Sequence, residues 1–552
     1  MKDRRKRSVL SSGVFLFWCT IIFLCSAGFT FSTLRLLFTA GGFHPRLVSK
    51  WNIPAMEAVS DENSVIPAIS IRETVIFPEE ALVFLKYPSS ASLFTKDDIN
   101  CIYLAPNSSQ PQLQLSPSSV EFDYDNQHII RCPLQPRGTI LSLSVKHNGN
   151  LTPGRVYRWD SLAYETVIDR DNSTVVFVKG LNLRSGRIAD SSKFKCLYGL
   201  DLTNQKFVLW ADVVSVAQEI VRCKTPLSIL NSPQRFNDST KVSVRVVGKK
   251  TLNSIARLEK HKFNPKPLAA THKQHEICVC TMLRNQARFL HEWIAYHARI
   301  GVQRWFIYDN NSDDDIEHVV ESLVGENYNV TRRLWPWIKT QEAGFAHCAL
   351  TARDSCEWVG FIDVDEFLHL PSGGNLSLYD VVANRSRPSD VAELRVSCHS
   401  FGPSGLKNVP KKGVTVGYTC RLAAPERHKS IVKPEALNSS MINLVHHFHL
   451  KSGYRHVNVN RSALVINHYK YQVWEVFKEK FYRRVATYVS DWQQERNVGS
   501  KDRAPGLGTK AVEPFDWSTR FCEVKDTGLR DWVLETFTDP QTRLLPWERK
   551  SD

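Results

Sequence analysis

The stretch EWVGFIDVDEFLHL, residues 357 to 370, constrains this chain strongly because an apolar run meets Asp363, Asp365 and Glu366 directly. On a strand, alternate side chains share a face, so the two aspartates would repel each other unless a cation lay between them. Hard divalent ions such as Mg²⁺ and Mn²⁺ accept carboxylate and phosphate oxygens together. The spacing therefore favours a metal-phosphate site, although solvated acids that follow a buried strand give the same short pattern.

A basic N-terminus followed by a long apolar stretch predicts a membrane anchor. Five Lys and Arg lie between Lys2 and Arg7, and no charged residue occurs from Ser8 to Leu34. That length spans a bilayer, and the basic cluster should stay cytosolic. A cleaved signal peptide is the alternative, but the apolar region exceeds the usual signal core. We expect a cytosolic tail over residues 1 to 11, a transmembrane anchor over 12 to 34, and a lumenal stem over 35 to 64.

The cysteines and sequons suit this lumenal placement. Eleven of the 13 cysteines follow the predicted anchor, and their odd number leaves at least one thiol unpaired or bonded to a second chain, as in a homodimer. There is no Cys-x-x-Cys pair, so a zinc ribbon is not indicated. Cys278 and Cys280 should share a strand face and are predicted to be buried thiols. Ten N-x-Ser/Thr sequons, one of them at Asn310, are typical of a secretory protein.

Length and charge bound the function. The 552 residues exceed one ordinary core and indicate several domains. The net charge of +15 could indicate binding to nucleic acid, but a lumenal protein is in a different compartment from nucleic acid. A basic lumenal surface fits a nucleotide diphosphate or an acidic polysaccharide instead, or is simply solvated. We therefore predict that nucleic acid is not a partner.

The pattern of apolar residues changes near residue 250. Residues 65 to 247 contain short β-type runs between turn-rich pieces, which predicts a β-sandwich or a related module. A basic, Pro-containing segment over residues 248 to 274 is predicted as a linker. From residue 275 to residue 552 we expect an α/β domain. It begins with strand EICVCTML, a helix over NQARFLHEWIAYHARI and strand VQRWFIYD.

This strand-helix-strand unit is typical of a nucleotide-binding half of a doubly wound sheet, where ligands gather at the carboxyl ends of strands. Asp309 and Asn310 follow the second strand and are candidates to bind a nucleoside, although a helix N-cap signal in NSDDD explains Ser312 and its neighbours without any ligand. The chain has neither a G-x-G-x-x-G after the first strand nor a P-loop motif. Dinucleotide oxidoreductases and P-loop enzymes are therefore disfavoured.

Four separated segments resemble the family 92 glycosyltransferases of plants, whose better-known members are β-1,4-galactan synthases. They are CTMLRNQARFLHEWIAYHARIGVQRWFIYDNNSDD, GFIDVDEFL, KSIVKP and INHYKYQVWEVFKEKF, within about residues 275 to 500. The resemblance implies a GT-A catalytic domain that is Rossmann-like with a mixed sheet, a UDP-sugar donor such as UDP-galactose, and Mn²⁺ or Mg²⁺. It also implies a Golgi enzyme that extends a cell-wall polysaccharide such as pectic galactan, with a carbohydrate-binding module over residues 65 to 247.

The resemblance also implies roles for the acidic motif and its neighbours. Asp365 would be the main metal ligand, while Asp363 would share the ion or contact the ribose. His468 is the preferred third ligand and His449 is the alternative. His447 and His449 lie two apart, so they are otherwise expected on one strand face as core or acceptor-site residues. The family's donor-side motif is matched by Thr281, Arg284, Asn285 and Glu292.

Galactan synthases invert the configuration of the transferred sugar, so a base must deprotonate the acceptor hydroxyl. Glu426 is the predicted base because Arg427, His428 and Lys429 beside it would keep it ionised, although these neighbours fit an ordinary ion-pair loop equally well. Either Lys429 or Lys433 would help neutralise the departing diphosphate. The competing hypothesis is a lumenal glycan-binding or scaffold protein without turnover.

Overall fold

The computed structural model describes most of the chain after the predicted stem. The described residues are 69–86, 94–106, 110–123, 127–146, 149–184, 186–203, 205–231, 240–258, 273–372, 377–488 and 512–548. The predicted tail, anchor and stem lie outside these ranges. Within them, no helix is long and apolar enough to cross a membrane.

The first β-unit packs two sheets around one core. A five-stranded sheet has the order β5-β6-β2-β1-β9, and a four-stranded sheet has the order β4-β3-β7-β8. A disulfide between Cys101 on β3 and Cys132 on β6 joins the two sheets. The strands are β1 (Ser70–Ile76), β2 (Glu80–Lys86), β3 (Ile99–Leu104), β4 (Pro111–Leu115), β5 (Ser119–Asp123), β6 (Gln127–Pro133), β7 (Ile140–Val145), β8 (Gly149–Asn150) and β9 (Arg155–Arg158).

The second β-unit follows immediately. Its main sheet has the order β16-β13-β14-β15-β11-β10-β17, with β12 beside β14, and Cys196 is bonded to Cys223. The last strand, β17, lies within the segment predicted as a linker. The elements are β10 (Leu162–Ile168), β11 (Ser173–Lys179), β12 (Ile188–Ala189), β13 (Phe194–Gly199), β14 (Leu209–Ala217), β15 (Ile220–Lys224), α2 (Leu227–Leu230), β16 (Lys241–Val246) and β17 (Asn253–Ser254).

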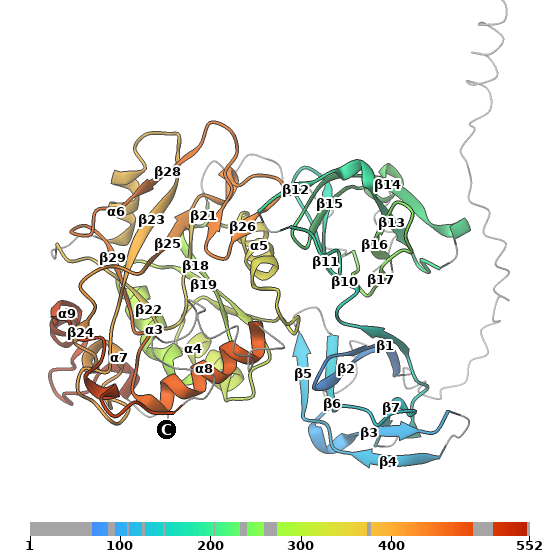
Figure 1. Cartoon of the computed structure of the whole chain (residues 1–552), viewed down its shortest axis with the longest axis horizontal. Helices are drawn as coiled ribbons and strands as arrows, with labels where there is room; N and C mark the ends of the chain where they lie inside the picture. Colours follow the sequence, from blue (N-terminus) through green and yellow to red (C-terminus); the bar gives the residue numbers. More distant parts are fainter. Residues whose placement is uncertain are drawn as a thin grey trace, which may run out of the picture. The chain divides into compact units, whose positions relative to one another are not determined.

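The two β-units repeat one plan. The sequence Glu-Thr-Val-Ile occurs in β1 from Glu73 and again in β10 from Glu165. Each copy follows a register shift in an antiparallel hairpin, and each strand also pairs in parallel with the last strand of its unit. Each unit carries one disulfide. The single β-rich module expected from the sequence is therefore two similar units in tandem (Figure 1).

The remaining chain forms the predicted α/β domain around a nine-stranded mixed sheet, drawn from green to red in Figure 1. Strands β20, β19, β18 and β21 run parallel, and β25 joins β21 antiparallel. The sheet order continues β25-β23-β29-β22, with β28 beside β23. Its strands are β18 (His275–Leu283), β19 (Arg304–Asp309), β20 (Val330–Leu334), β21 (Cys356–Phe361), β22 (Glu366–His369), β23 (Val391–Ser400), β25 (Arg427–Val432), β28 (Arg455–Asn458) and β29 (Val465–His468).

Helices and short ladders complete the domain. The helices are α3 (Ala287–Arg299), α4 (Ile316–Gly325), α5 (Gln341–Ala352), α6 (Leu378–Arg385), α7 (Val414–Gly417), α8 (Trp474–Tyr488) and α9 (Gly528–Phe537). Two small ladders pair β24 (Cys420–Arg421) with β30 (Val524–Lys525), and β26 (Asn443–Leu444) with β27 (His447–Phe448). The predicted strand-helix-strand unit is confirmed as β18, α3 and β19.

Helix α3 fixes the segment that follows β21. Most of its side chains are buried, among them those of Leu290, Trp293 and Ile294. The Trp293 indole donates to the Glu366 carbonyl at 2.9 Å, and the Tyr296 hydroxyl donates to the Leu368 carbonyl at 2.6 Å. Both contacts are buried, so the core of the domain holds the backbone that carries the acidic motif.

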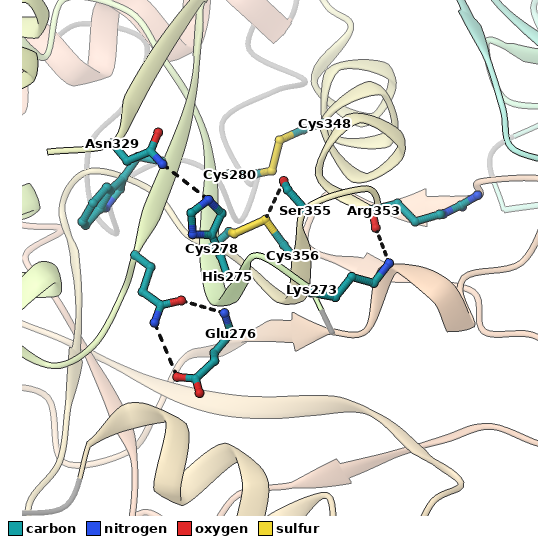
Figure 2. Close-up of a disulfide and its surroundings, with 12 residues drawn as sticks. Lys273, His275, Glu276, Cys278, Cys280, Asn329, Cys348, Arg353, Ser355 and Cys356 are labelled. Atoms are coloured by element: carbon teal, nitrogen blue, oxygen red, sulfur yellow. Dashed lines mark hydrogen bonds between the residues drawn. A yellow bond between two sulfur atoms is a disulfide. The ribbon is translucent and has the colours of Figure 1, made fainter. Parts of the chain in front are cut away.

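The prediction of buried thiols at Cys278 and Cys280 is wrong. The two side chains do lie on one strand face, but Cys278 is bonded to Cys356 on β21 and Cys280 is bonded to Cys348 on α5 (Figure 2). Their partners are 78 and 68 residues away and come close only when the α/β fold has formed. A disulfide between Cys420 and Cys522 accounts for two more of the cysteines that follow the predicted anchor. Among the described cysteines, Cys398 is free and buried.

The β-units share a buried apolar cluster with the α/β domain. Val75 and Phe84 of the first unit and Tyr164 of the second belong to the same cluster as Trp335 and Phe345. A buried ion pair joins Arg353, just after α5, to Asp169 at 2.7 Å. Packing of this kind makes the described parts of the β-units and the α/β domain interdependent, which a flexible linker between independent modules would not.

Candidate active site

The acidic motif forms a tight turn between two strands. β21 ends at Phe361 and β22 begins at Glu366, so the aspartates do not alternate along a strand as expected. The Asp363 amide donates to the Glu366 carboxylate at 2.9 Å, and the Glu366 amide donates to the Asp363 carbonyl at 3.0 Å. This reciprocal bonding turns the chain and directs both aspartates into one pocket.

Two neighbouring pockets open beside this turn. The first, of about 350 Å³, is lined by Arg284, Asn310, Asp363, Asp365 and Lys480 among others. The second, of about 480 Å³, includes Glu426, His428, Lys429 and His468. Gln341 and Asp363 line both pockets, so the pockets meet at the acidic motif. Both volumes fall within the range of about 300 to 1,000 Å³ that is usual for ligand pockets.

Asp363 and Glu366 share the ammonium group of Lys429. Lys429 Nζ lies 2.8 Å from Asp363 and 2.9 Å from Glu366, and the Glu366 side chain is fully buried. Burial favours a raised pKa at Asp363, but the charge of Lys429 outweighs it and holds the pKa well below its usual range. Burial dominates at Glu366 and raises its pKa. The turn thus carries one firmly ionised carboxylate beside a carboxyl group that ionises less readily.

Asp365 contacts two cationic or basic groups. It pairs with Lys480 of α8, and its Oδ2 lies 3.4 Å from His468 Nε2. Burial favours a raised pKa at Asp365, but Lys480 and His468 outweigh it and lower the pKa strongly. His468 ends β29, directly opposite Glu366 on β22, so antiparallel pairing places the imidazole at the acidic turn.

The donor set suits a divalent ion. Two ligands of one ion, each about 2.1 Å from it, lie roughly 3 to 4 Å apart, and the separation of 3.4 Å between Asp365 and His468 meets this condition. Carboxylate oxygens and an imidazole are ligands that Mn²⁺ accepts. Across the described residues, however, no three acidic, His or Cys side chains are grouped as a metal cluster. Lys429 and Lys480 pair with the same carboxylates instead.

Two predicted donor-side residues reach the first pocket. Arg284 and Asn310 line it at the carboxyl ends of β18 and β19, the edge at which doubly wound sheets bind ligands. The Asn310 side chain donates to the Trp335 carbonyl at 2.7 Å and to the Trp337 carbonyl at 3.3 Å. These bonds hold Asn310 in the pocket wall.

Asn285 and Asp309 bind neighbouring loops rather than line either pocket. Asn285, at φ 53°, accepts a hydrogen bond from the Asp313 amide at 2.9 Å, and its own amide donates to Ser312 Oγ at 3.0 Å. Asp309 is buried, pairs with Arg332 at 2.8 Å and accepts from the Ser312 amide at 2.9 Å. Their structural contacts account for both side chains without a ligand.

Thr281 and Glu292 are also placed away from both pockets. Thr281 is fully buried in β18. Glu292 is buried on α3, where its carboxylate accepts from the amides of Val414 and Thr415 at 2.8 and 2.9 Å. Burial raises the pKa of Glu292 to about 7 against these hydrogen bonds. Glu292 therefore holds the start of α7, and the structure does not bring it to the acidic turn.

The predicted base, Glu426, lines the second pocket, but its carboxylate already accepts hydrogen bonds from neighbouring side chains. Ser400 Oγ and Lys470 Nζ donate to its Oε2, the latter at 3.0 Å, and the Tyr471 hydroxyl lies 3.4 Å from Oε1. Burial favours a raised pKa, but Ser400 and Lys470 outweigh it and lower the pKa of Glu426. These donors make the carboxylate a weaker base.

The remaining basic candidates divide between the second pocket and the outside. Lys429 and His447 line the second pocket, whereas His449 is exposed and lines neither pocket. Lys433 lies over the Trp358 ring at 4.9 Å and lines neither pocket. Burial and Lys429 lower the pKa of His446 to about 3, and this neutral imidazole lies 2.6 Å from Lys429 Nζ.

Sequence reasoning missed Lys480 and His446. Lys480 stands in the quoted segment INHYKYQVWEVFKEKF, but it pairs with an aspartate 115 residues earlier, which no local spacing reveals. His446 is adjacent to the considered His447, and its Nδ1 lies 2.9 Å from the Phe361 carbonyl. Only the folded sheet brings these side chains to the acidic turn.

The sheet is of the kind that binds nucleotides, and an acidic turn lies at the carboxyl ends of its strands. These features fit the class of transferases that use sugar nucleotides. The family model for glycosyltransferase family 92 matches residues 273–498. A family 92 protein of Ricinus communis is 61% identical, covering 99% of this chain and 100% of the relative. One of Oryza sativa subsp. japonica is 51% identical over 96% and 93% of the two chains. The chain belongs to glycosyltransferase family 92, and it is a glycosyltransferase.

Solved structures give a more distant likeness. A mannosyltransferase from Pyrobaculum calidifontis in complex with GDP-Man and Mn²⁺ is 13% identical, with a TM-score of 0.24 over 42% of this chain and 66% of that one. Glucosyl-3-phosphoglycerate synthase from Mycobacterium tuberculosis is 15% identical, with a TM-score of 0.21 over 39% and 82%. Values this low carry no argument about the present chain.

Proposed function

We propose that this chain is a metal-dependent, inverting glycosyltransferase of GT-A type that transfers galactose from UDP-galactose to a cell-wall polysaccharide such as β-1,4-galactan. The observation that carries the proposal is the position of Asp363, which lies where the two pockets meet. A transferase needs its donor and its acceptor to meet at one group of atoms. The first pocket holds the nucleotide sugar, and the second holds the acceptor.

Residues of the first pocket bind the donor. A divalent ion would be held by His468 of the second pocket together with Asp363 and Asp365 of the first, and when bound it would supply Lewis-acid neutralisation of the diphosphate. Arg284 and Lys480 line the same pocket and add positive charge for the diphosphate oxygens. Asn310 closes the wall with a fixed carboxamide, held by the Trp335 carbonyl. The chain's own residues thus orient the donor beside the second pocket.

The N-terminal sequence supports a location of this activity in the secretory pathway. A basic tail before an uncharged apolar stretch fits a single-pass type II protein of the Golgi membrane with a lumenal catalytic domain. Five disulfides in the described residues are suited to an oxidising lumen. The two β-units are proposed to bind the polysaccharide.

One observation favours the alternative, a glycan-binding protein without turnover. Lys429 and Lys480 already neutralise the two aspartates, which reduces the charge left for a metal. A donor screen separates the two hypotheses. The full chain is incubated with UDP-galactose, UDP-glucose and other UDP-sugars, with Mn²⁺ or with a chelator, and with β-1,4-galactan oligosaccharides.

We expect Mn²⁺-dependent UDP release with UDP-galactose and a product longer by one residue. The coupling constant of the new anomeric proton in the NMR spectrum of that product would show its anomeric configuration. UDP release from another UDP-sugar alone would support a transferase but would reject galactose as the transferred sugar. Binding of oligosaccharide without UDP release from any donor would favour the alternative.

A further inference from the structure

A buried carboxylate is linked to the second pocket through two imidazoles. Glu393 on β23 is 1% exposed, and its Oε1 lies 3.0 Å from His447 Nδ1. His447 Nε2 lies 2.8 Å from Nδ1 of His428 on β25. Both histidines line the second pocket. Three strands, β23, β27 and β25, thus bring a Glu-His-His series into line.

The hydrogen bonds decide where the protons lie. Burial favours a raised pKa at Glu393, but His447, Arg395 and Ser430 outweigh it and lower the pKa to about 2, so Glu393 only accepts. His447 Nδ1 therefore carries a proton, and in the neutral ring its Nε2 has the lone pair. His447 Nε2 lies 2.8 Å from His428 Nδ1 and 3.1 Å from the His428 carbonyl, and we assign the tautomer in which it accepts from the nearer group, His428 Nδ1. The lone pair of His428 is consequently on Nε2, the nitrogen that the series leaves available.

The surroundings keep His428 neutral but ready to accept a proton. Burial lowers its pKa, as do His447 and Arg395, whereas the charge of Glu393 opposes them. These are the ionisable groups that face His428 from β27 and β23. When His428 takes up a proton, the new charge is stabilised through His447 by the Glu393 carboxylate. The arrangement has the logic of a base oriented by a second group and a buried acid.

Glu426 lacks these properties. Ser400 and Lys470 donate to its carboxylate, and Lys470 adds a full positive charge at 3.0 Å. Proton uptake by Glu426 would break these contacts. For His428, in contrast, the charge of the Glu393 carboxylate favours the protonated form against burial, His447 and Arg395.

We propose that His428 is the catalytic base that deprotonates the acceptor hydroxyl, with His447 and Glu393 as positioning residues. This assignment rests on the proposed function. His428 Nε2 takes the hydroxyl proton while the acceptor oxygen forms a bond to the anomeric carbon. The bond from that carbon to the diphosphate oxygen breaks, and its electron pair leaves with UDP. Glu426 then shapes the pocket through Ser400 and Lys470.

The test compares variants of the full chain with the donor and acceptor that support transfer by the wild type. His428→Gln should lower kcat by roughly a hundredfold to ten-thousandfold, the usual range for a general base, and UDP binding measured by calorimetry should not change. His456→Gln is the matched control, because His456 is exposed on β28 of the same sheet. Its activity should equal that of the wild type. Added imidazole should restore part of the activity of His428→Ala.

The positioning role has its own readout. Loss of the carboxylate in Glu393→Gln removes the charge that favours protonated His428, so the acidic limb of the kcat profile should move to lower pH and the plateau should fall. His447→Gln breaks the link between the carboxylate and His428, so kcat should fall, and an unchanged kcat in this variant would reject the series if Glu393→Gln does not fold. A profile with an unmoved acidic limb would reject the series.

The outcomes separate this inference from the function on which it rests. If the wild type releases no UDP from any donor, the proposed function fails and the base assignment fails with it. If the wild type is active and His428→Gln keeps more than about a tenth of its kcat, the base assignment alone is wrong. Loss in Glu426→Gln with retained activity in His428→Gln would return the role of base to Glu426.

Discussion

Asp169→Asn should destabilise the whole described body, although it lies in the second β-unit. The Asp169 side chain is 6% exposed and holds two guanidinium groups, those of Arg222 and Arg353, each at 2.7 Å. Arg222 retains a contact to Asp171 at 3.4 Å. Arg353 retains only the Met441 sulfur at 3.8 Å among its described side-chain contacts. The substitution therefore leaves Arg353 buried without a carboxylate.

Removing one partner of a buried pair costs about 3 to 5 kcal/mol. We expect a loss of about 3 kcal/mol, near the lower limit, because Arg222 keeps a second acid. Urea unfolding followed by tryptophan fluorescence measures it. Asp160→Asn is the control, because Asp160 pairs with an exposed Arg158. The free energy of unfolding of this variant should equal that of the wild type. A loss in Asp169→Asn no larger than in the control would refute the reasoning.

The same pair predicts a pH dependence. Burial favours a raised pKa at Asp169, but Arg353 and Arg222 outweigh it and lower the pKa. A carboxyl group with a lowered folded pKa contributes stability above its unfolded pKa of about 3.9 and loses that contribution as pH falls. The stability difference between wild type and Asp169→Asn should therefore shrink below about pH 4.

Three further predictions follow from buried contacts. Lys429→Met should destabilise the protein by about 3 to 5 kcal/mol, because the buried Glu366 loses its cation. Urea unfolding measures this loss, and Lys411→Met, which changes an exposed lysine, should show none. Peptide mapping without reductant should recover the five disulfides as described, with Cys398 alkylated only after denaturation; a labelled Cys398 in the native protein would contradict its burial. Asn310 should carry no glycan despite its sequon, because its carboxamide faces the Trp335 carbonyl inside a pocket, and an occupied Asn310 in active enzyme would exclude the proposed nucleotide position.

The elements that the sequence predicted well are those with strong local periodicity. Helix α3 buries the face that its 3.6-residue period marks, and β18 and β19 flank it as expected. Asp363 and Asp365 line one pocket, but the expected strand geometry is wrong, because the strand ends at Phe361 and a turn places both side chains.

Long-range pairing set the limit of prediction. Disulfide partners of Cys278 and Cys280 cannot be chosen from spacing alone. Lys480 reaches Asp365 only because α8 packs beside the acidic turn. Glu292 shows the opposite error, since a matched motif suggested a ligand where burial and the Thr415 amide give it a structural role.

The sequence contains a repeat that marks the two β-units, but it was not used to predict them. The two Glu-Thr-Val-Ile strands recur 92 positions apart, at Glu73 and Glu165, and an Arg-Cys pair follows in each unit at Arg131 and Arg222. Both arginines are buried and contact the α/β domain, through Asn311 and the Ser439 carbonyl respectively. A search for solenoid periods does not detect a single duplication of this length.

The rate of UDP release from UDP-galactose in Mn²⁺ tests the central claim most directly, in wild type, Asp365→Asn and Glu357→Gln. Glu357 lies on β21 at the end away from the acidic turn and serves as the matched control. A metal that supplies several kcal/mol to the barrier makes Asp365→Asn slower by on the order of a thousandfold, while Glu357→Gln keeps the wild-type rate. Near-normal release by Asp365→Asn in Mn²⁺ would show that the paired aspartates are structural and would contradict the account.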